Sequence, residues 1–393
     1  MPMTVIDIRN VFSDRHIEII DINPSYIYYF EEKNEEGRNE LFLLEYNRKT
    51  RKERLVMNYT LDDPTYMEHI YSFDKTIVMV LENGSNSFWL IEIDKKTGGE
   101  LNRRKVVCTG AFRECKPLDS EYLLIYMGPD EANAEVFSKY KEIKGRDCLC
   151  YLYNIKTNQK YLVNAAMINR IGGDNIKPIT VESLPYLLLL DPFAEESVKE
   201  HYYSEQRWVS ADIRDNIWLS KTSEVEMDIE DGKEAVTRKC IASADIKALV
   251  RYMGMDDHKV YFRAKEFRSG TEKICSYDIT TEALQIEATP GGFNNDTFYM
   301  IEEKPFKMFA VTVSKNKTTV VGLINSEARI VYDNTLGQFM TCIDNRYCVT
   351  KKTVFSEESQ REFTYFYLYD AHLEQYESYE CNCLVKGDTL VLY

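Results

Sequence analysis

A short phrase that recurs along the chain is the feature that most constrains its fold. The phrase is an Asp or Asn followed by polar residues and often a Thr, and it comes after an alternating stretch of aromatic or aliphatic residues. The clearest copies are "EYNRKTR" (45–51), "EIDKKTG" (92–98), "LYNIKTN" (152–158) and "SYDITTE" (276–282). Alternation with a period of two is typical of a β-strand, and a short polar side chain favours a tight turn because it can bond nearby backbone groups. Each copy therefore predicts a strand that ends in a tight turn.

The spacing of these turns indicates the architecture. The anchor residues are Asn47, Asp94, Asn154, Asp228, Asp278, Asn325 and Asp370, of which Asp228 and Asn325 are the weaker matches. Most successive anchors are 45–50 residues apart, and a second hairpin with a polar turn precedes them, so each repeat contains four short antiparallel strands. A period of this length with four strands per repeat is the signature of a β-propeller blade. We therefore expect an all-β chain that forms a single β-propeller domain over residues 1–393.

The repeated turn also resembles a known group of propellers. The pattern apolar-x-apolar-Asp/Asn-x-x-Thr is similar to the repeats of TolB-like propellers and of the propeller domains attached to prolyl-peptidases. The resemblance spans nearly the whole chain and implies the architecture only. At the two ends, "CLVKGDTLVLY" (383–393) reads as the first hairpin of a further blade and "MTVIDIRNVF" (3–12) as an outer strand. We expect strands from both ends to pair and close the ring, since this removes two exposed sheet edges, and we expect seven or eight blades.

Two intervals between anchors are longer than the rest and predict helical insertions. They place one insertion at 128–147 in the third blade and another at 191–218 in the fourth, and both begin with a Pro and acidic residues, as helices often do. Val136, Phe137, Tyr140 and Ile143 fall on one face of the first predicted helix.

Both insertions are expected on the same face of the ring, where a scaffold usually meets its ligands. Two roles stay open for them: the helices brace the ring, or they form a lid or a docking surface. The candidate binding residues are Tyr140, His201, Tyr202, Tyr203 and Trp208.

The sequence contains no signature of catalysis. Its five histidines form no HExxH motif or His-rich cluster, and neither a Gly-x-Ser-x-Gly elbow nor a P-loop occurs. The ten cysteines lack metal-site spacing. We therefore expect no catalytic residue, no metal ligand and no cofactor. A divalent metal in the axial channel, held by carboxylates and one histidine from several blades, is the alternative that leaves no local motif.

The charge of the chain narrows the choice of partner. A formal net charge of −15 argues against nucleic-acid binding, because phosphate contacts need a basic surface. A partner steered by this field is expected to be basic or metal-bearing. No stretch approaches the ~18 uninterrupted apolar residues of a membrane span, and no apolar signal-peptide region is found near residue 1. We expect a cytoplasmic location and no membrane contact.

Three functions follow, in descending order of support. The first is a non-catalytic binding scaffold whose insertion-decorated face holds a protein or peptide partner. The second is a metal-assisted lyase or hydrolase with its site at the axial channel. The third is a binder of a small molecule or glycan, suggested by the 28 tyrosines. The fold does not choose among them, since function resides in the sites that a scaffold carries.

Overall fold

The computed structural model describes most of the chain. The described residues are 4–8, 15, 17–23, 25–35, 38–61, 65–84, 86–144, 148–191, 216–243, 248–256, 258–266, 272–288, 297–302, 308–314, 317–324, 327–334, 338–343, 347–356, 361–370, 375–381, 383–386 and 389–393.

Within these ranges the strands form seven antiparallel sheets of four strands and one sheet of three. The first sheet contains β2 (Ile17–Ile22), β3 (Tyr26–Glu35), β4 (Arg38–Asn47) and β5 (Lys52–Leu61). The second contains β6 (Thr65–Ser72), β7 (Thr76–Asn83), β8 (Ser87–Asp94) and β9 (Glu100–Val107). The third contains β10 (Ala111–Pro117), β11 (Tyr122–Gly128), β12 (Leu149–Asn154) and β13 (Lys160–Leu162). The next two contain β14 (Ile176–Val181), β15 (Leu184–Asp191), β16 (Asn216–Lys221) and β17 (Lys239–Ala242); and β18 (Ala248–Asp256), β19 (Lys259–Glu266), β20 (Glu272–Asp278) and β21 (Leu284–Ala288).

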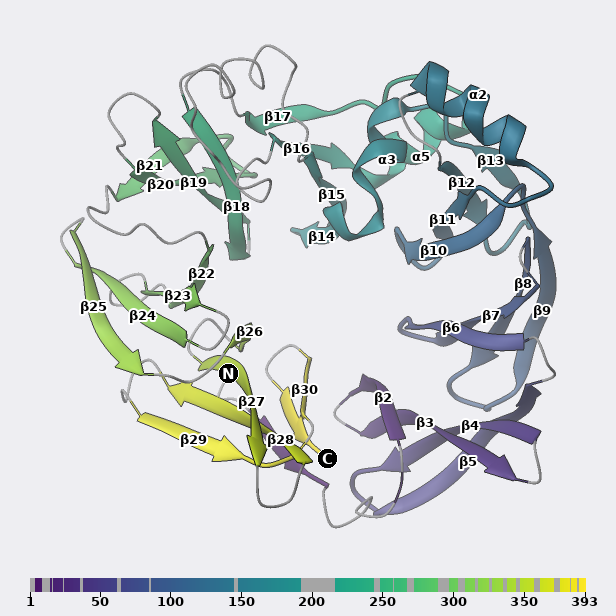
Figure 1. The fold of residues 1–393 in the computed structure, drawn as a ribbon, viewed down its shortest axis with the longest axis horizontal. Helices are drawn as coiled ribbons and strands as arrows, with labels where there is room; N and C mark the ends of the chain where they lie inside the picture. The colour runs from purple at the N-terminus through teal and green to yellow at the C-terminus, as the bar shows by residue number, and fades with distance from the viewer. Residues whose placement is uncertain are drawn as a thin grey trace.

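The remaining four-stranded sheets contain β22 (Thr297–Glu302), β23 (Met308–Ser314), β24 (Lys317–Ile324) and β25 (Glu327–Asn334); and β26 (Gln338–Ile343), β27 (Tyr347–Ser356), β28 (Arg361–Asp370) and β29 (Gln375–Tyr379). The four-stranded sheets stand side by side around a central opening, and the first strand of each lies nearest to it (Figure 1). The chain is a β-propeller with four-stranded antiparallel blades, as the spacing of the turns predicts.

The sheet of three strands joins the two ends of the described chain. It contains β30 (Cys383–Lys386), β31 (Thr389–Leu392) and β1 (Thr4–Asp7), and β1 runs parallel to β31. Val391 packs with Ile8, Ile27 and Tyr29 in one core cluster, which the terminal sheet therefore shares with the sheet β2–β5.

The repeated phrase is the turn between the third and fourth strands of a blade. Asn47 and Asp278 each accept two backbone N–H groups on Oδ1, at 2.8–3.0 Å from Lys49 and Thr50 and at 2.9–3.0 Å from Thr280 and Thr281. Asn154 accepts two N–H groups in the same way, and Asp94 accepts the N–H of Thr97. The predicted turn chemistry is confirmed at these four anchors.

A second hydrogen bond ties each of these turns to the first turn of its own blade. The backbone N–H of the residue after the anchor donates to a backbone carbonyl of the first turn, at 2.8–2.9 Å. The donor and acceptor pairs are Arg48 and Ser25, Lys95 and Lys75, Ile155 and Glu121, and Ile279 and His258. The first and third turns of a blade therefore lie together at one end of the sheet. We call this side of the ring, which carries the turns at Asn47, Asp94, Asn154 and Asp278, the turn face.

A helix lies at the first predicted insertion, and its buried side differs from the prediction. α2 (Ala134–Lys144) connects β11 to β12 at the end of the sheet away from the turn face. Phe137 is buried, but Val136 is 47% exposed, so the two do not share the buried side. The ring of Phe137 fits against Gly110, where a Cβ would lie only 2.4 Å from Phe137 Cζ. This fit fixes the rotation of α2 on the blade.

The fourth repeat departs from the expected pattern at Asp228. This residue lies in α5 (Thr222–Glu230), between β16 and β17, and is not a turn anchor. Val225 and Ile229 of α5 are buried in the core formed with β12 and β15, so packing selects a helix here. The second predicted insertion, 191–218, is also too long, because β15 ends at Asp191 and β16 begins at Asn216.

Residues 192–215, where the second helix was expected, and the anchor Asn325 lie outside the described residues. Two short helical segments, α3 (Ala166–Ile171) and η1 (Gly173–Asn175), precede β14. Of the helices that the structure describes, none is long and apolar enough to cross a membrane.

Candidate functional site

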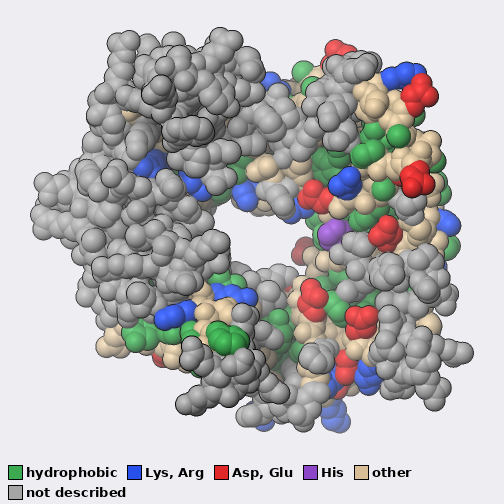
Figure 2. Space-filling view, in the orientation of Figure 1, with side chains coloured by type: hydrophobic (Ala, Val, Ile, Leu, Met, Phe, Trp, Pro, Cys, Tyr) green, Lys and Arg blue, Asp and Glu red, His purple; other side chains and the backbone are tan. Residues whose placement is uncertain are grey.

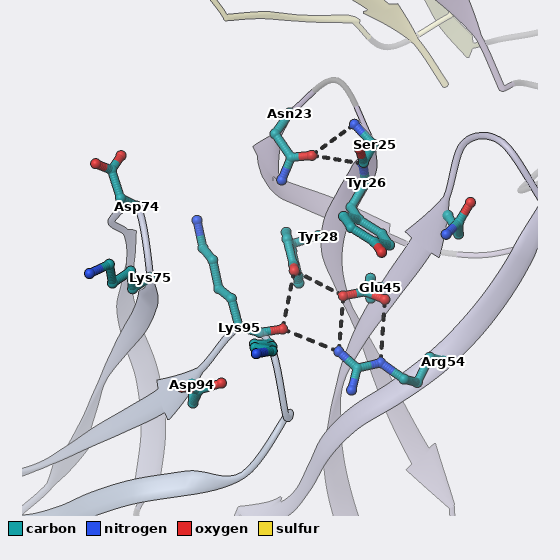
Figure 3. Close-up of a pocket in the computed structure, with 12 residues that line it drawn as sticks. Asn23, Ser25, Tyr26, Tyr28, Glu45, Arg54, Asp74, Lys75, Asp94 and Lys95 are labelled. Atoms are coloured by element: carbon teal, nitrogen blue, oxygen red, sulfur yellow. Dashed lines mark hydrogen bonds and ion pairs between the residues drawn. The ribbon is translucent and has the colours of Figure 1, made fainter.

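A polar pocket of about 790 Å³ opens on the turn face between the sheets β2–β5 and β6–β9 (Figure 3). Its lining comes from the first and third turns of both blades and from β3, β4 and β5. The lining residues are Asn23, Ser25, Tyr26, Tyr28, Glu45, Asn47, Arg54, Asp74, Lys75, Asp94, Lys95 and Lys96.

One wall of the pocket is a connected hydrogen-bond network. Tyr28 Oη donates to Glu45 Oε2 at 2.9 Å, and Arg54 donates to both Glu45 oxygens, at 2.9 Å from Nη2 and 3.3 Å from Nε. Arg54 also donates to the backbone carbonyls of Lys95 and Thr97, at 3.2 and 3.1 Å. Burial, reinforced by the bond to Glu45, raises the pKa of Tyr28, so its hydroxyl stays a neutral donor. The network locks the wall before any ligand arrives.

The floor of the pocket holds an ion pair that crosses from one blade to the next. Lys95 Nζ lies 2.6 Å from Asp21 Oδ2, and the two side chains are only 10% and 5% exposed. The hydroxyl of Ser72 donates to the same Asp21 oxygen, and Lys95 Nζ sits 5.4 Å from the centre of the Tyr28 ring. Burial lowers the pKa of Lys95, and the carboxylate of Asp74 acts in the opposite direction.

The repeat shows why this lysine is unusual. Lys95 directly follows the anchor Asp94, and the matching positions in two other blades are Ile155 and Ile279. Both isoleucines are buried in the apolar cores between neighbouring sheets. Replacing a buried ion pair by well-packed apolar residues is often neutral or stabilising. Stability alone therefore does not account for a lysine at this position, although Arg48 shows that the first blade also accepts a cation there.

The mouth of the pocket carries charges of both signs. Lys75, Lys96 and Asp74 are exposed. Asp94 accepts hydrogen bonds from the backbone N–H and the hydroxyl of Thr97, and these bonds hold the pKa of its carboxyl below the usual range. The lining therefore presents two lysines and two aspartates to a ligand, in addition to Lys95 and the Glu45–Arg54 pair.

The candidate residues from the sequence do not line this pocket where the structure describes them. Tyr140 lies in α2, at the opposite end of the sheets. His201, Tyr202, Tyr203 and Trp208 lie outside the described residues. The sequence reasoning missed the pocket because its lining is made of the repeated turns, which the pattern marks as structural. The sequence feature that could have indicated the pocket is Lys95, because two other repeats have isoleucine at the matching position.

The axial channel is open through the centre of the ring, and side chains of both charges border its described part (Figure 2). In the described part of the chain, no group of three or more His, Cys, Asp or Glu residues could hold a metal ion. His69 on β6 stacks on Tyr71, with ring centres 5.8 Å apart, and His258 lies 3.2 Å from Asp278 in a turn. Both histidines therefore have structural partners.

Comparison with known proteins bears on the fold alone. No family model and no curated protein matches the chain. Solved structures that resemble it include an uncharacterized protein from Listeria monocytogenes EGD-e, with 8% identity, a TM-score of 0.47, and coverage of 96% of this chain and 97% of that one.

Two other neighbours belong to the groups that the turn repeat resembles. The β-propeller domain of the Trilobed protease from Pyrococcus furiosus has 10% identity and a TM-score of 0.42, with 93% of this chain and 97% of that one covered. TolB from Acinetobacter baumannii has 10% identity and a TM-score of 0.33, with 90% and 79% covered. The resemblance stated from the sequence is thus confirmed, and identities this low carry no information about function.

Proposed function

We propose that the protein is a non-catalytic binding scaffold that holds a segment of a protein or peptide partner in the pocket on the turn face. The observation that carries this proposal is the preformed wall of Tyr28, Glu45 and Arg54, which is tied to the backbone of the neighbouring blade. A site that is already ordered loses less conformational entropy on binding. The volume of about 790 Å³ also lies within the range of ligand sites.

The lining favours a peptide segment over an apolar small molecule. Asn23, Asn47 and Tyr26 offer polar groups at the mouth beside the charged residues. A peptide brings backbone N–H and carbonyl groups that can match such a lining. The overall charge of −15 still favours a partner whose surface is basic, because the long-range field steers its approach.

Selection of peptides from a random 12-residue phage library on the immobilised full-length protein tests the proposal. We expect enriched peptides that lose at least about tenfold in affinity for the pocket variants Lys75→Glu and Lys96→Glu. Lys49→Glu is the matched control, since Lys49 is also exposed and stands two residues after its anchor, as Lys96 does. Failure to enrich any peptide, or equal binding to all three variants, would contradict the proposal.

The face that carries α2 is a second candidate docking surface, and the exposed Val136 favours it. Tyr140 and the predicted residues His201, Tyr202, Tyr203 and Trp208 belong to this second proposal. We expect Val136→Glu to weaken partner binding without loss of stability if α2 forms the contact. Unchanged affinity of every selected peptide for Val136→Glu leaves the pocket as the site.

A further inference from the structure

We propose that the pocket recognises a carboxylate group, which the ammonium of Lys95 binds at the pocket floor. This inference rests on the proposed binding function and names the chemical group that the site selects.

Lys95 has unused capacity to donate hydrogen bonds. An ammonium has three donors, and the bond to Asp21 uses one of them. Within the described part of the chain, no second acceptor takes a hydrogen bond from Lys95 Nζ. Figure 3 shows the side chain reaching past Tyr28 toward the turn that carries Asp74 and Lys75. An acceptor that enters the pocket there can take the remaining donors.

The surroundings favour an anionic acceptor. Hydrogen bonds between charged groups are roughly twice as strong as neutral ones, and a buried ammonium is less screened than one in solvent. Lys75 and Lys96 add two cations near the entrance. The acidic groups in the lining are exposed or already bonded. Asp74 is exposed, Asp94 accepts two hydrogen bonds from Thr97, and Glu45 is bonded to Arg54.

The comparison between repeats supports the same conclusion. An apolar ligand group would be served best by an apolar side chain at position 95, such as the isoleucine found at the matching positions 155 and 279. The chain instead keeps a lysine that is neutralised by Asp21 in the absence of ligand. A carboxylate that enters the pocket completes the coordination of this ammonium.

Two parts of a peptide supply a carboxylate, namely the C-terminus and an Asp or Glu side chain. Three small probes of nearly equal shape distinguish them. Acetyl-glutamine amide has no carboxylate, acetyl-glutamine has the C-terminal carboxylate, and acetyl-glutamate amide has the side-chain carboxylate. Each is titrated into the full-length protein, and the backbone amide resonances of residues 74–76 and 94–98 are followed by NMR.

We expect saturable shifts with at least one carboxylate probe, with a Kd about tenfold lower than that of acetyl-glutamine amide. The probe with the lower Kd identifies the source of the carboxylate. In the double variant Lys95→Ile/Asp21→Asn the tenfold preference should disappear, whereas Lys49→Gln should keep it. The second substitution removes the carboxylate whose counter-ion is lost in the first.

Equal Kd values for the three probes, absence of saturable shifts, or an unchanged preference in the double variant would overturn the inference. The proposed binding function and the carboxylate inference can be contradicted independently of each other. If selected peptides bind the pocket but show no preference for a carboxylate, the scaffold stands and only this inference is wrong.

Discussion

The ammonium of Lys95 lies 2.6 Å from the carboxylate of Asp21, and this pair joins the second blade to the first beneath a polar pocket. Both groups are buried, so their mutual attraction is offset by the loss of water around each charge. Removing one charge of the pair is therefore expected to change the free energy of unfolding more than removing both charges.

The first prediction separates these two effects. Lys95→Ile leaves the buried Asp21 carboxylate without its counter-ion, and we expect a loss of about 3 kcal/mol in the free energy of unfolding. The free energy of unfolding of Lys95→Ile/Asp21→Asn should stay within about 1 kcal/mol of that of the parent protein. This double variant removes both buried charges and places at position 95 the isoleucine found at the matching positions of two other blades. Urea denaturation of the parent, both single variants and the double variant measures the coupling. A double variant whose loss in the free energy of unfolding equals the sum of the losses of the two single variants would show that the pair is not coupled.

The second prediction concerns the contact that seats α2 on the third blade. Gly110 has a positive φ of 98°, and a Cβ there would lie 2.3 Å from the carbonyl oxygen of Gly128 and 2.4 Å from Phe137 Cζ. We expect Gly110→Ala to lower the free energy of unfolding by more than about 3 kcal/mol, because backbone strain and steric overlap add. Gly84→Ala is the matched control, with a φ of 83° and no atom within 4 Å of the added Cβ, and should cost about 1 kcal/mol. Equal effects of the two substitutions in thermal unfolding would show that the overlap is relieved by movement of α2.

Most of the architecture could be predicted from the sequence because the same local chemistry is repeated in blade after blade. The anchors Asn47, Asp94, Asn154 and Asp278 form the expected turns, since a short side chain bonding its own backbone needs no distant partner. Asp228 was misread because the apolar residues Val225 and Ile229 at helical spacing outweigh a single Asp in a strand-like context.

The candidate site could not be predicted in the same way. Asp21 and Lys95 are 74 residues apart, and their contact depends on how two blades pack. Sequence spacing within a blade carries no information about that contact. The predicted rotation of α2 was wrong at Val136 for a related reason, since the close fit of Phe137 against Gly110, not helical periodicity, decides which side chain is buried.

The third prediction tests whether the terminal strands close the ring. Ile8 donates its backbone N–H to Leu392 at 2.9 Å and is buried with Val391 against the first blade. If the terminal sheet completes the ring, Ile8→Ala should lower the free energy of unfolding of the whole chain by about 2–4 kcal/mol, in one cooperative transition. Val5→Ala, on the exposed side of β1, should cost less than about 0.5 kcal/mol. A transition in which only the ends of the chain unfold, followed by hydrogen exchange, would contradict closure by these strands.

The fourth prediction is a dependence of stability on pH that comes from Glu226 on α5. Burial, followed by the nearby carboxylates of Asp119, Glu121 and Glu230, raises the pKa of Glu226 to about 8. Because the folded protein holds this proton more tightly than the unfolded chain does, the stabilising contribution is complete below the ordinary carboxyl pKa and is lost as pH rises toward 8.

Glu226→Gln keeps a neutral side chain at every pH and therefore removes this loss. At pH 9 we expect the variant to be more stable than the parent by about 1–2 kcal/mol, a value reduced for the partial exposure of the side chain. At pH 4 the two proteins should have nearly the same free energy of unfolding. Urea denaturation at both pH values measures the difference, and Glu131→Gln on an exposed turn is the control for loss of one negative charge. A gain in stability that is equal at pH 4 and pH 9 would show that the pKa of Glu226 is the same in the folded protein and in the unfolded chain.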